Sequence, residues 1–264
     1  MKTRSFIVPV LAMVTLLFLV LPILIVVPMS FSASSSLAFP PVGLSLRWYD
    51  SFFKNEAWLD ALGTSVLLAA ISSTFALVLG SLGAYGLCRR KFRGKAAAES
   101  NFMAPMVLPT IITAVALYIA FAKIGLLGTF FGLVLAHTLL GVPFVVIVMS
   151  VAIRSFDMRM EQVSWTMGAS WLLTMRRVVL PQLLPSLAAA WIFAFVHSFD
   201  EVVVTSFIAG PFDTVPKRMF NELTLEITPT ITAVATLLIG FTSLCLIGAG
   251  LILRKVSRSA VVPA

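Results

Sequence analysis

Long runs of apolar residues, separated by shorter polar stretches, make up most of the chain. Each run is long enough for a transmembrane helix, which needs about 20 mostly apolar residues to cross the hydrocarbon core of a bilayer. The pattern predicts an all-α polytopic membrane protein with about six transmembrane helices. The predicted spans are Phe6–Val27, Ala61–Leu87, Phe102–Ala122, Phe130–Ile153, Leu184–Ile208 and Ile231–Leu253.

The composition excludes a soluble globular domain. Of the 264 residues, 59% are hydrophobic and 11% are charged, and the mean hydropathy is +1.04. A soluble domain of this length would have to expose apolar side chains over most of its surface. The first apolar run follows Lys2 and Arg4, as in a signal peptide, but it is much longer than the roughly 7 to 15 apolar residues of such a peptide. We therefore expect a retained first helix.

Basic residues are distributed unevenly between the two sets of predicted loops. Most of the 19 lysines and arginines lie at the two termini, in the stretch Arg89–Lys95 and between Arg154 and Arg177. All of these positions fall on one side of the predicted membrane, and cytoplasmic loops carry an excess of Lys and Arg, so both termini are expected in the cytoplasm. The basic stretch Arg89–Gly94 is interpreted as a topology anchor beside anionic membrane lipids. The net charge of +8 therefore reflects topology, and no nucleic-acid partner is expected.

The longest polar interruption in the second half of the chain, residues 154–185, has the pattern of two short amphipathic helices. Gly168 is expected to end the first helix, Ser170 to cap the second and Pro181 to end it. The polar residues of the first helix, among them Glu161, fall mostly opposite an apolar face whose members are three and four residues apart. On the cytoplasmic side, such a helix pair predicts a docking surface for a soluble partner. The apolar face consists of Phe156, Met160, Val163, Met167 and Trp171.

The same stretch resembles the cytoplasmic coupling loop of ABC-importer permeases. In that family the sequence EAA is followed by three residues, a glycine, nine residues and Ile-x-Leu-Pro. Here Gln162-Val163-Ser164 occupies the EAA positions, Gly168 follows after three residues, and Val178, Leu180 and Pro181 complete the pattern. The acidic position holds Gln162, with Glu161 one residue earlier. The resemblance implies a coupling loop over residues 154–181 whose contacts with an ATPase subunit involve Glu161, Gln162, Ser164, Gly168, Ala169, Ser170, Leu180 and Pro181. The alternative is an ordinary interfacial helix pair.

Two adjacent carboxylates, Asp200 and Glu201, lie towards the end of the fifth predicted span. Ionised groups at that depth are expected to face the bundle interior or a water-filled cavity, where the pair would attract a cation. The alternative is that they cap the end of a helix near water. His197 precedes them at helical spacing, but three candidate ligands on one helix make a poor metal site, and none is expected. His137, in the fourth span, is interpreted as a hydrogen-bonded residue between helices.

A second resemblance narrows the family. The sequences FRGK at Phe92–Lys95, FDMRM at Phe156–Met160 and SFDEVVVTSFIAGP at Ser198–Pro211 are similar to the spermidine/putrescine permease branch. This resemblance implies a single permease domain over residues 1–264 with the fold of a type I ABC importer, in the bacterial inner membrane. It also implies that Asp200 and Glu201 line a path for a small cationic solute, most simply a polyamine.

The resemblance further implies the partners of the chain. They are a second, homologous permease subunit, two cytoplasmic ATPase subunits and a periplasmic or lipid-anchored substrate-binding protein. The chain contains no phosphate-binding loop of the form G-x-x-x-x-G-K-[ST], so we expect no catalytic residue and no cofactor in it. ATP and Mg²⁺ would bind to the ATPase subunits.

Other classes remain open from the sequence alone. Within the importer class, the solute is alternatively an amino acid, an aminophosphonate or an opine. A stand-alone secondary transporter would have symmetric halves with paired broken helices, and these are not apparent. An intramembrane enzyme that used His197 with the two acids would need a nucleophile or a metal. Cys88 and Cys245 are interpreted as packing residues.

Overall fold

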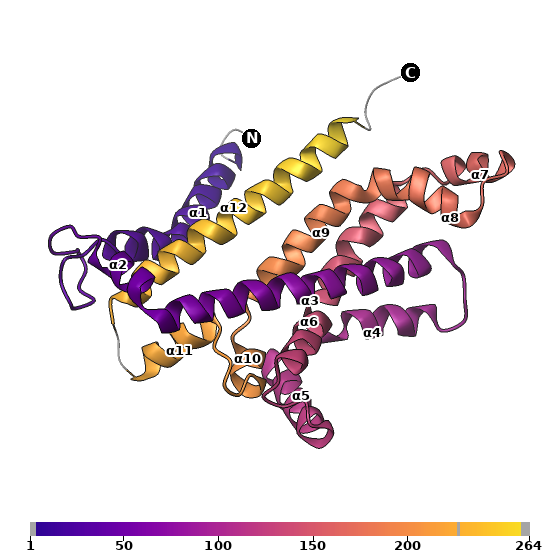
Figure 1. Cartoon of the computed structure of the whole chain (residues 1–264). Coiled ribbons are helices and arrows are strands. Elements are labelled where there is room, and N and C mark those ends of the chain that lie inside the picture. The colour runs from indigo at the N-terminus through magenta and orange to yellow at the C-terminus, as the bar shows by residue number, and fades with distance from the viewer. Residues whose placement is uncertain (1–3, 226–227, 260–264) are drawn as a thin grey trace. The chain divides into compact units, whose positions relative to one another are not determined.

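The computed structural model describes residues 4–225 and 228–259, and helices dominate this part of the chain (Figure 1). Extended structure in the described residues is limited to an isolated antiparallel bridge between Ser32 and Leu44. In chain order the helices are α1 (Arg4–Met29), α2 (Arg47–Lys54), α3 (Glu56–Arg89), α4 (Lys95–Val107), α5 (Thr110–Ile124), α6 (Phe130–Ser155), α7 (Met158–Thr166), α8 (Trp171–Thr174), a π-helical turn η1 (Met175–Val179), α9 (Leu180–Asp200), α10 (Val203–Ile208), α11 (Val215–Leu225) and α12 (Thr230–Ser259).

The predicted number of spans agrees with this structure. By length and composition, five helical stretches in the described residues are suited to crossing a membrane, and a bent pair of helices gives a sixth. The prediction of an all-α polytopic protein with about six spans is confirmed. The five stretches are Phe6–Met29, Glu56–Arg89, Phe130–Ser155, Trp171–Asp200 and Thr230–Leu253.

Two spans differ from the sequence-based prediction. The fifth, expected over Leu184–Ile208, instead covers Trp171–Asp200, and the short helix α10 follows it after a break.

The third span also differs. We expected one continuous helix over Phe102–Ala122, but α4 and α5 meet at an angle of 102°. Leu108 is extended, with φ −73° and ψ 140°, because a residue before proline is pushed out of the helical region. Pro109, which has no N–H to donate to the preceding turn, completes the break.

The chain divides into two compact units. The first contains Met1–Asp60 and Arg218–Phe241, and the second contains Ala61–Lys217 and Thr242–Ala264. In the first unit the indole N–H of Trp48 donates to the carbonyl of Ser32 at 2.9 Å, which ties α2 to the segment that follows α1. All of the predicted functional residues belong to the second unit. A single permease domain over residues 1–264 stays a prediction.

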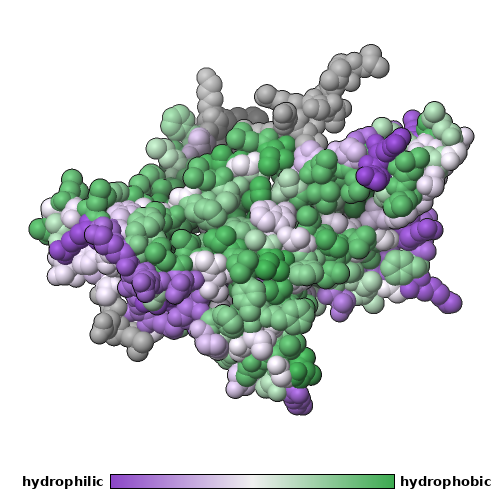
Figure 2. All heavy atoms as spheres, in the orientation of Figure 1, coloured by the Kyte–Doolittle hydropathy of each residue, from purple (hydrophilic) through white to green (hydrophobic). Residues whose placement is uncertain are grey.

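The core of the second unit is built around α6, which packs most extensively against α9. Helix α3 also approaches α6 closely, because a Cβ atom at Gly80 would lie 2.7 Å from the Cβ of Val145. Only glycine allows the two helices to come so near at this point. Figure 2 shows hydrophobic side chains over the middle of these long helices, and hydrophilic side chains at the end that carries α7, α8 and the α3–α4 loop. This end holds the coupling segment, the name used below for residues 154–181.

Candidate functional site

The coupling segment is a helix–glycine–helix unit, as predicted. Asp157 caps α7 by accepting a hydrogen bond from the N–H of Arg159 at 2.9 Å. Gly168 has φ +82°, a left-handed conformation that favours glycine, and it ends the first helix. Ser170 then caps α8 through the N–H of Leu173 at 3.3 Å. Local chain chemistry therefore sets the turn between the two helices.

The second half of the segment differs from the prediction that Pro181 ends a helix. Helix α8 continues through the π-helical turn η1 into α9, and Pro181 lies in the first turn of α9. A proline ring normally clashes with the carbonyl four residues earlier. The wider π turn directly before Pro181, in which the N–H of Leu180 bonds to the carbonyl of Met175, relieves that conflict. The coupling segment is therefore continuous with the long helix α9.

The inner face of α7 is polar, which reverses the expected arrangement. Glu161 is buried, with 2% of its side chain exposed, and it forms an ion pair with Arg89 of α3 at 2.7 Å. The hydroxyl of Tyr85, one turn earlier on α3, donates to the other carboxylate oxygen at 3.3 Å. Ser164, one turn after Glu161, hydrogen-bonds Thr174 of α8 at 2.9 Å. Polar contacts thus fix α7 to its neighbours.

The outer side of α7 exposes most of its large apolar side chains, beside polar ones such as Gln162. Met167 is 82% exposed and Val163 is 56% exposed, although both residues belong to the predicted apolar face. Phe156 alone among that set is buried. Gln162, at the acidic position of the family pattern, is also exposed. The predicted coupling residues divide accordingly. Glu161 is buried, Ser164 and Ala169 are half-buried, and Gln162, Gly168, Ser170, Leu180 and Pro181 are exposed.

A buried network of hydrogen bonds centres on His137 of α6. One ring nitrogen contacts the hydroxyl of Ser198 at 2.8 Å, and the other contacts the hydroxyl of Thr205 at 3.0 Å. Ser198 in turn contacts Ser72 of α3 at 2.9 Å. The expectation of a hydrogen-bonded histidine between helices is confirmed. Its partners were missed, and the only signal for them was the presence of hydroxyl residues inside apolar spans.

The adjacent acids Asp200 and Glu201 have different surroundings. Helix α9 ends at Asp200, whose side chain is exposed. Glu201 is buried and accepts a hydrogen bond from the N–H of Val204 at 2.8 Å, so it caps the short helix α10. At the backbone break between α9 and α10, the carboxylate of Asp200 is therefore accessible, while that of Glu201 is hydrogen-bonded to the backbone of α10.

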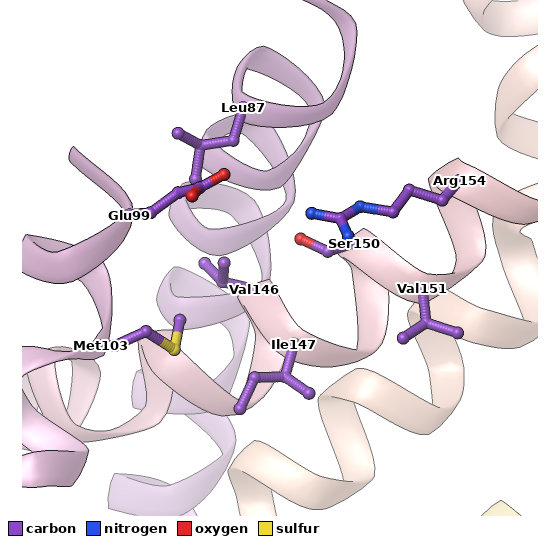
Figure 3. Close-up of a pocket in the computed structure, with 8 residues that line it drawn as sticks. All are labelled: Leu87, Glu99, Met103, Val146, Ile147, Ser150, Val151 and Arg154. Carbon is purple, nitrogen blue, oxygen red and sulfur yellow. The ribbon is translucent and has the colours of Figure 1, made fainter. Parts of the chain in front are cut away.

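A separate cavity of about 310 Å³ lies between α3, α4 and α6 (Figure 3). Its walls are mainly apolar, and Glu99 of α4 and Arg154 of α6 reach it from different sides. It contains none of the predicted substrate-path residues. Among the described residues, no group of three or more His, Cys, Asp or Glu side chains is arranged to hold a metal ion.

Comparison with known proteins decides the family. The family model described as "Binding-protein-dependent transport system inner membrane component" matches residues 76–258, which is more than half of the chain. The chain belongs to this family.

Full-length relatives agree with this assignment. The chain is 33% identical over 242 residues to the spermidine/putrescine transport system permease protein PotC of Escherichia coli (strain K12), and the match covers 91% of each chain. It is 32% identical over 235 residues to the putrescine transport system permease protein PotI of the same strain, covering 84% of this chain and 82% of PotI.

Solved structures extend the comparison to the fold. The chain resembles a chain in the crystal structure of a bacterial ABC transporter involved in the import of the acidic polysaccharide alginate. The TM-score is 0.67 at 14% sequence identity, and 96% of both chains is covered. The fold is therefore that of a type I ABC-importer transmembrane domain.

The predicted resemblance and class are confirmed by these matches. The chain is a multi-pass membrane permease of a binding-protein-dependent transporter, and it is not an enzyme. In such importers separate subunits use ATP.

Proposed function

We propose that this chain is one permease subunit of an ATP-driven importer that carries polyamines such as spermidine or putrescine across the bacterial inner membrane. The observation that carries the substrate class is the near full-length similarity to PotC and PotI, whose names specify these two polyamines. Polyamines are small, flexible cations at neutral pH, so an accessible carboxylate in the path suits them electrostatically.

The importer would contain four further subunits. They are a second permease homologous to this chain, two cytoplasmic ATPase subunits that bind ATP and Mg²⁺, and a periplasmic or lipid-anchored substrate-binding protein. The exposed apolar face of the coupling segment supports an ATPase partner, because exposed clusters of large apolar side chains mark interaction surfaces. The exposed residues of the predicted coupling set, Gln162, Gly168, Ser170, Leu180 and Pro181, would contact that partner directly.

The continuity of the coupling segment with α9 suggests how movement reaches the substrate path. When the ATPase subunits close on ATP, they would displace α7 and α8 as a rigid body. Helix α9 continues from α8 without a break, so its far end, at Asp200 and Glu201, would move as well. Asp200 would offer its carboxylate to an ammonium group, and Glu201 would keep α10 in place beside it.

The test is ATP-dependent uptake by proteoliposomes that contain the assembled importer and its binding protein. We expect uptake of spermidine or putrescine that a hundredfold excess of neutral amino acid does not inhibit. Asp200→Asn should raise KM for the polyamine by about fivefold, since one charge contact in a partly solvated site contributes on the order of 1 kcal/mol.

The matched control is Asp50→Asn, which removes an exposed carboxylate of α2 that is ion-paired with Lys54. It should leave KM unchanged. Import of another solute without polyamine uptake would refute the substrate class, and an unchanged KM in Asp200→Asn would remove this acid from the path.

A further inference from the structure

Arg89 stands apart from the basic stretch to which it belongs. Residues 89–95 together fit the pattern of a topology anchor, and Arg90 is exposed in keeping with that role. The side chain of Arg89, however, is only 9% exposed. A residue that served only to mark the cytoplasmic side would have no reason to bury its guanidinium.

The surroundings of Arg89 are built around one partner. Its Nη2 donates to Oε1 of Glu161 at 2.7 Å, while Tyr85 donates to Oε2. The guanidinium carbon lies 5.5 Å from the ring centre of Phe156, within the range of a cation–π contact. Both carboxylate oxygens of Glu161 are therefore held by side chains of α3, and Phe156 shields the pair.

This ion pair joins elements that the chain itself does not join directly. Helix α7 follows α6, and α8 continues into α9, so the backbone connects the coupling segment to those two helices. Helix α3 has no such connection. The contacts of Arg89 and Tyr85 with Glu161 supply it, about one turn into α7 and at the last turn of α3.

We propose that Arg89 and Glu161 are positioning residues that make α3 move with the coupling segment. The inference rests on the proposed function, in which an ATPase subunit displaces that segment. In this proposal Glu161 holds the inner side of the coupling segment against α3. The exposed side of α7 contacts the ATPase subunit. A buried, hydrogen-bonded charge pair suits this role because separating the two charges is costly, so the helices keep one relative position.

The experiment is a double-mutant cycle in the assembled importer, with Arg89→Gln, Glu161→Gln and the double variant. Three quantities are measured: accumulation of the complex, ATP hydrolysis, and polyamine imported per ATP hydrolysed. Each single variant leaves one buried charge without its partner, so accumulation and import per ATP should both fall. The double variant leaves no charge unpaired and should recover accumulation. Its import per ATP should stay at least about fivefold below wild type, the lower end of typical coupling between sites.

Arg90→Gln is the matched control, because it removes an exposed charge from the same basic stretch. It should behave as wild type in all three measurements. If the double variant regained wild-type import per ATP, the Arg89–Glu161 pair would be a purely structural contact, and the proposal would be overturned. If Arg89→Gln and Arg90→Gln lowered accumulation of the complex equally and Glu161→Gln did not lower it, Arg89 would be only a topology anchor.

These outcomes are separate from failure of the proposed function. If the wild-type chain does not associate with an ATPase subunit, or imports without ATP, the proposed function fails before the variants are compared. If wild type imports normally and the double variant is fully coupled, only the positioning role fails.

Discussion

Two buried polar residues of the helical bundle are each held by specific partners. His137 is 1% exposed and uses both ring nitrogens, and Glu161 uses both carboxylate oxygens. Unmatched polar groups are costly where water is scarce, so the contacts that satisfy these two side chains stabilise the packing of the helices. At the residue scale, buried polar side chains therefore identify the points where helices are fixed to one another.

Replacing His137 tests this reading of the buried network. His137→Ala should lower the free energy of unfolding by roughly 1–3 kcal/mol, from two lost hydrogen bonds at about 0.6 kcal/mol each and a new cavity. The measurement is unfolding of the purified chain in detergent. Ser206→Ala is the control, since it removes an exposed hydroxyl bonded to the carbonyl of Val202. Equal stability of the two variants would show that the network is dispensable.

At the scale of elements, α7 turns Glu161 and Ser164 towards the protein and exposes most of its large apolar side chains. A three-and-four periodicity identifies an amphipathic helix but not the direction in which its apolar face points. In water, that face normally packs against the core. Here Glu161 and Ser164 occupy the inner side, and most of the large apolar side chains are exposed.

Gly168 provides a test at this scale. A Cβ at this position would meet no atom within 4 Å, yet its φ is +82°. A substitution therefore destabilises the turn through the backbone and not through side-chain volume. The left-handed conformation raises the free energy of an ordinary L-residue by roughly 1–2 kcal/mol. Gly168→Ala and Gly168→Val should both reduce ATP-dependent uptake severalfold, and Gly168→Asn should reduce it least because asparagine tolerates this conformation.

The matched control for that series is Gly86→Ala. Gly86 is helical in α3, and a Cβ there also meets no atom within 4 Å, so uptake should be normal. Loss of uptake that scales with side-chain volume at Gly168 would instead indicate that the side chain obstructs the docking partner.

At the scale of the whole molecule, the chain exposes large apolar side chains at the end that carries α7 and α8. The exposed apolar residues of α7 and α8 lie at the end of the second unit where hydrophilic side chains also gather (Figure 2), beyond the apolar middle of the long helices. Under the proposed function, this surface is where an ATPase subunit docks. The function therefore belongs to an assembly.

Met167→Asp should test the assembly directly. The residue is 82% exposed, so the charge should not disturb folding, but it would place a desolvated carboxylate in an apolar interface. We expect at least a tenfold weaker association with the ATPase subunit, about 1.4 kcal/mol, measured by co-purification from membranes. Phe92→Asp makes the same kind of change at an exposed apolar residue of the α3–α4 loop and should have no effect. Equal retention of the ATPase by both variants would argue against docking at α7.

Much of the architecture follows from local sequence. Apolar runs of about 20 residues predicted the spans, and Gly168 and Ser170 predicted the turn between α7 and α8. Two of the misassignments involve proline. Pro109 breaks a span that appears continuous in hydropathy, and Pro181 is accommodated by a π turn where a helix end was expected. Proline changes backbone geometry without changing hydropathy, so an apolarity pattern cannot distinguish a break from a continuation.

The sequence by itself determined that this chain is a multi-span membrane protein and where its polar segments lie, because the energy of transfer into lipid depends on each residue's own chemistry and on run length. Only the tertiary structure decided that Glu161 faces Arg89 and that His137 joins Ser198 and Thr205. These pairings connect residues up to 72 positions apart, and nothing local to either partner specifies the other.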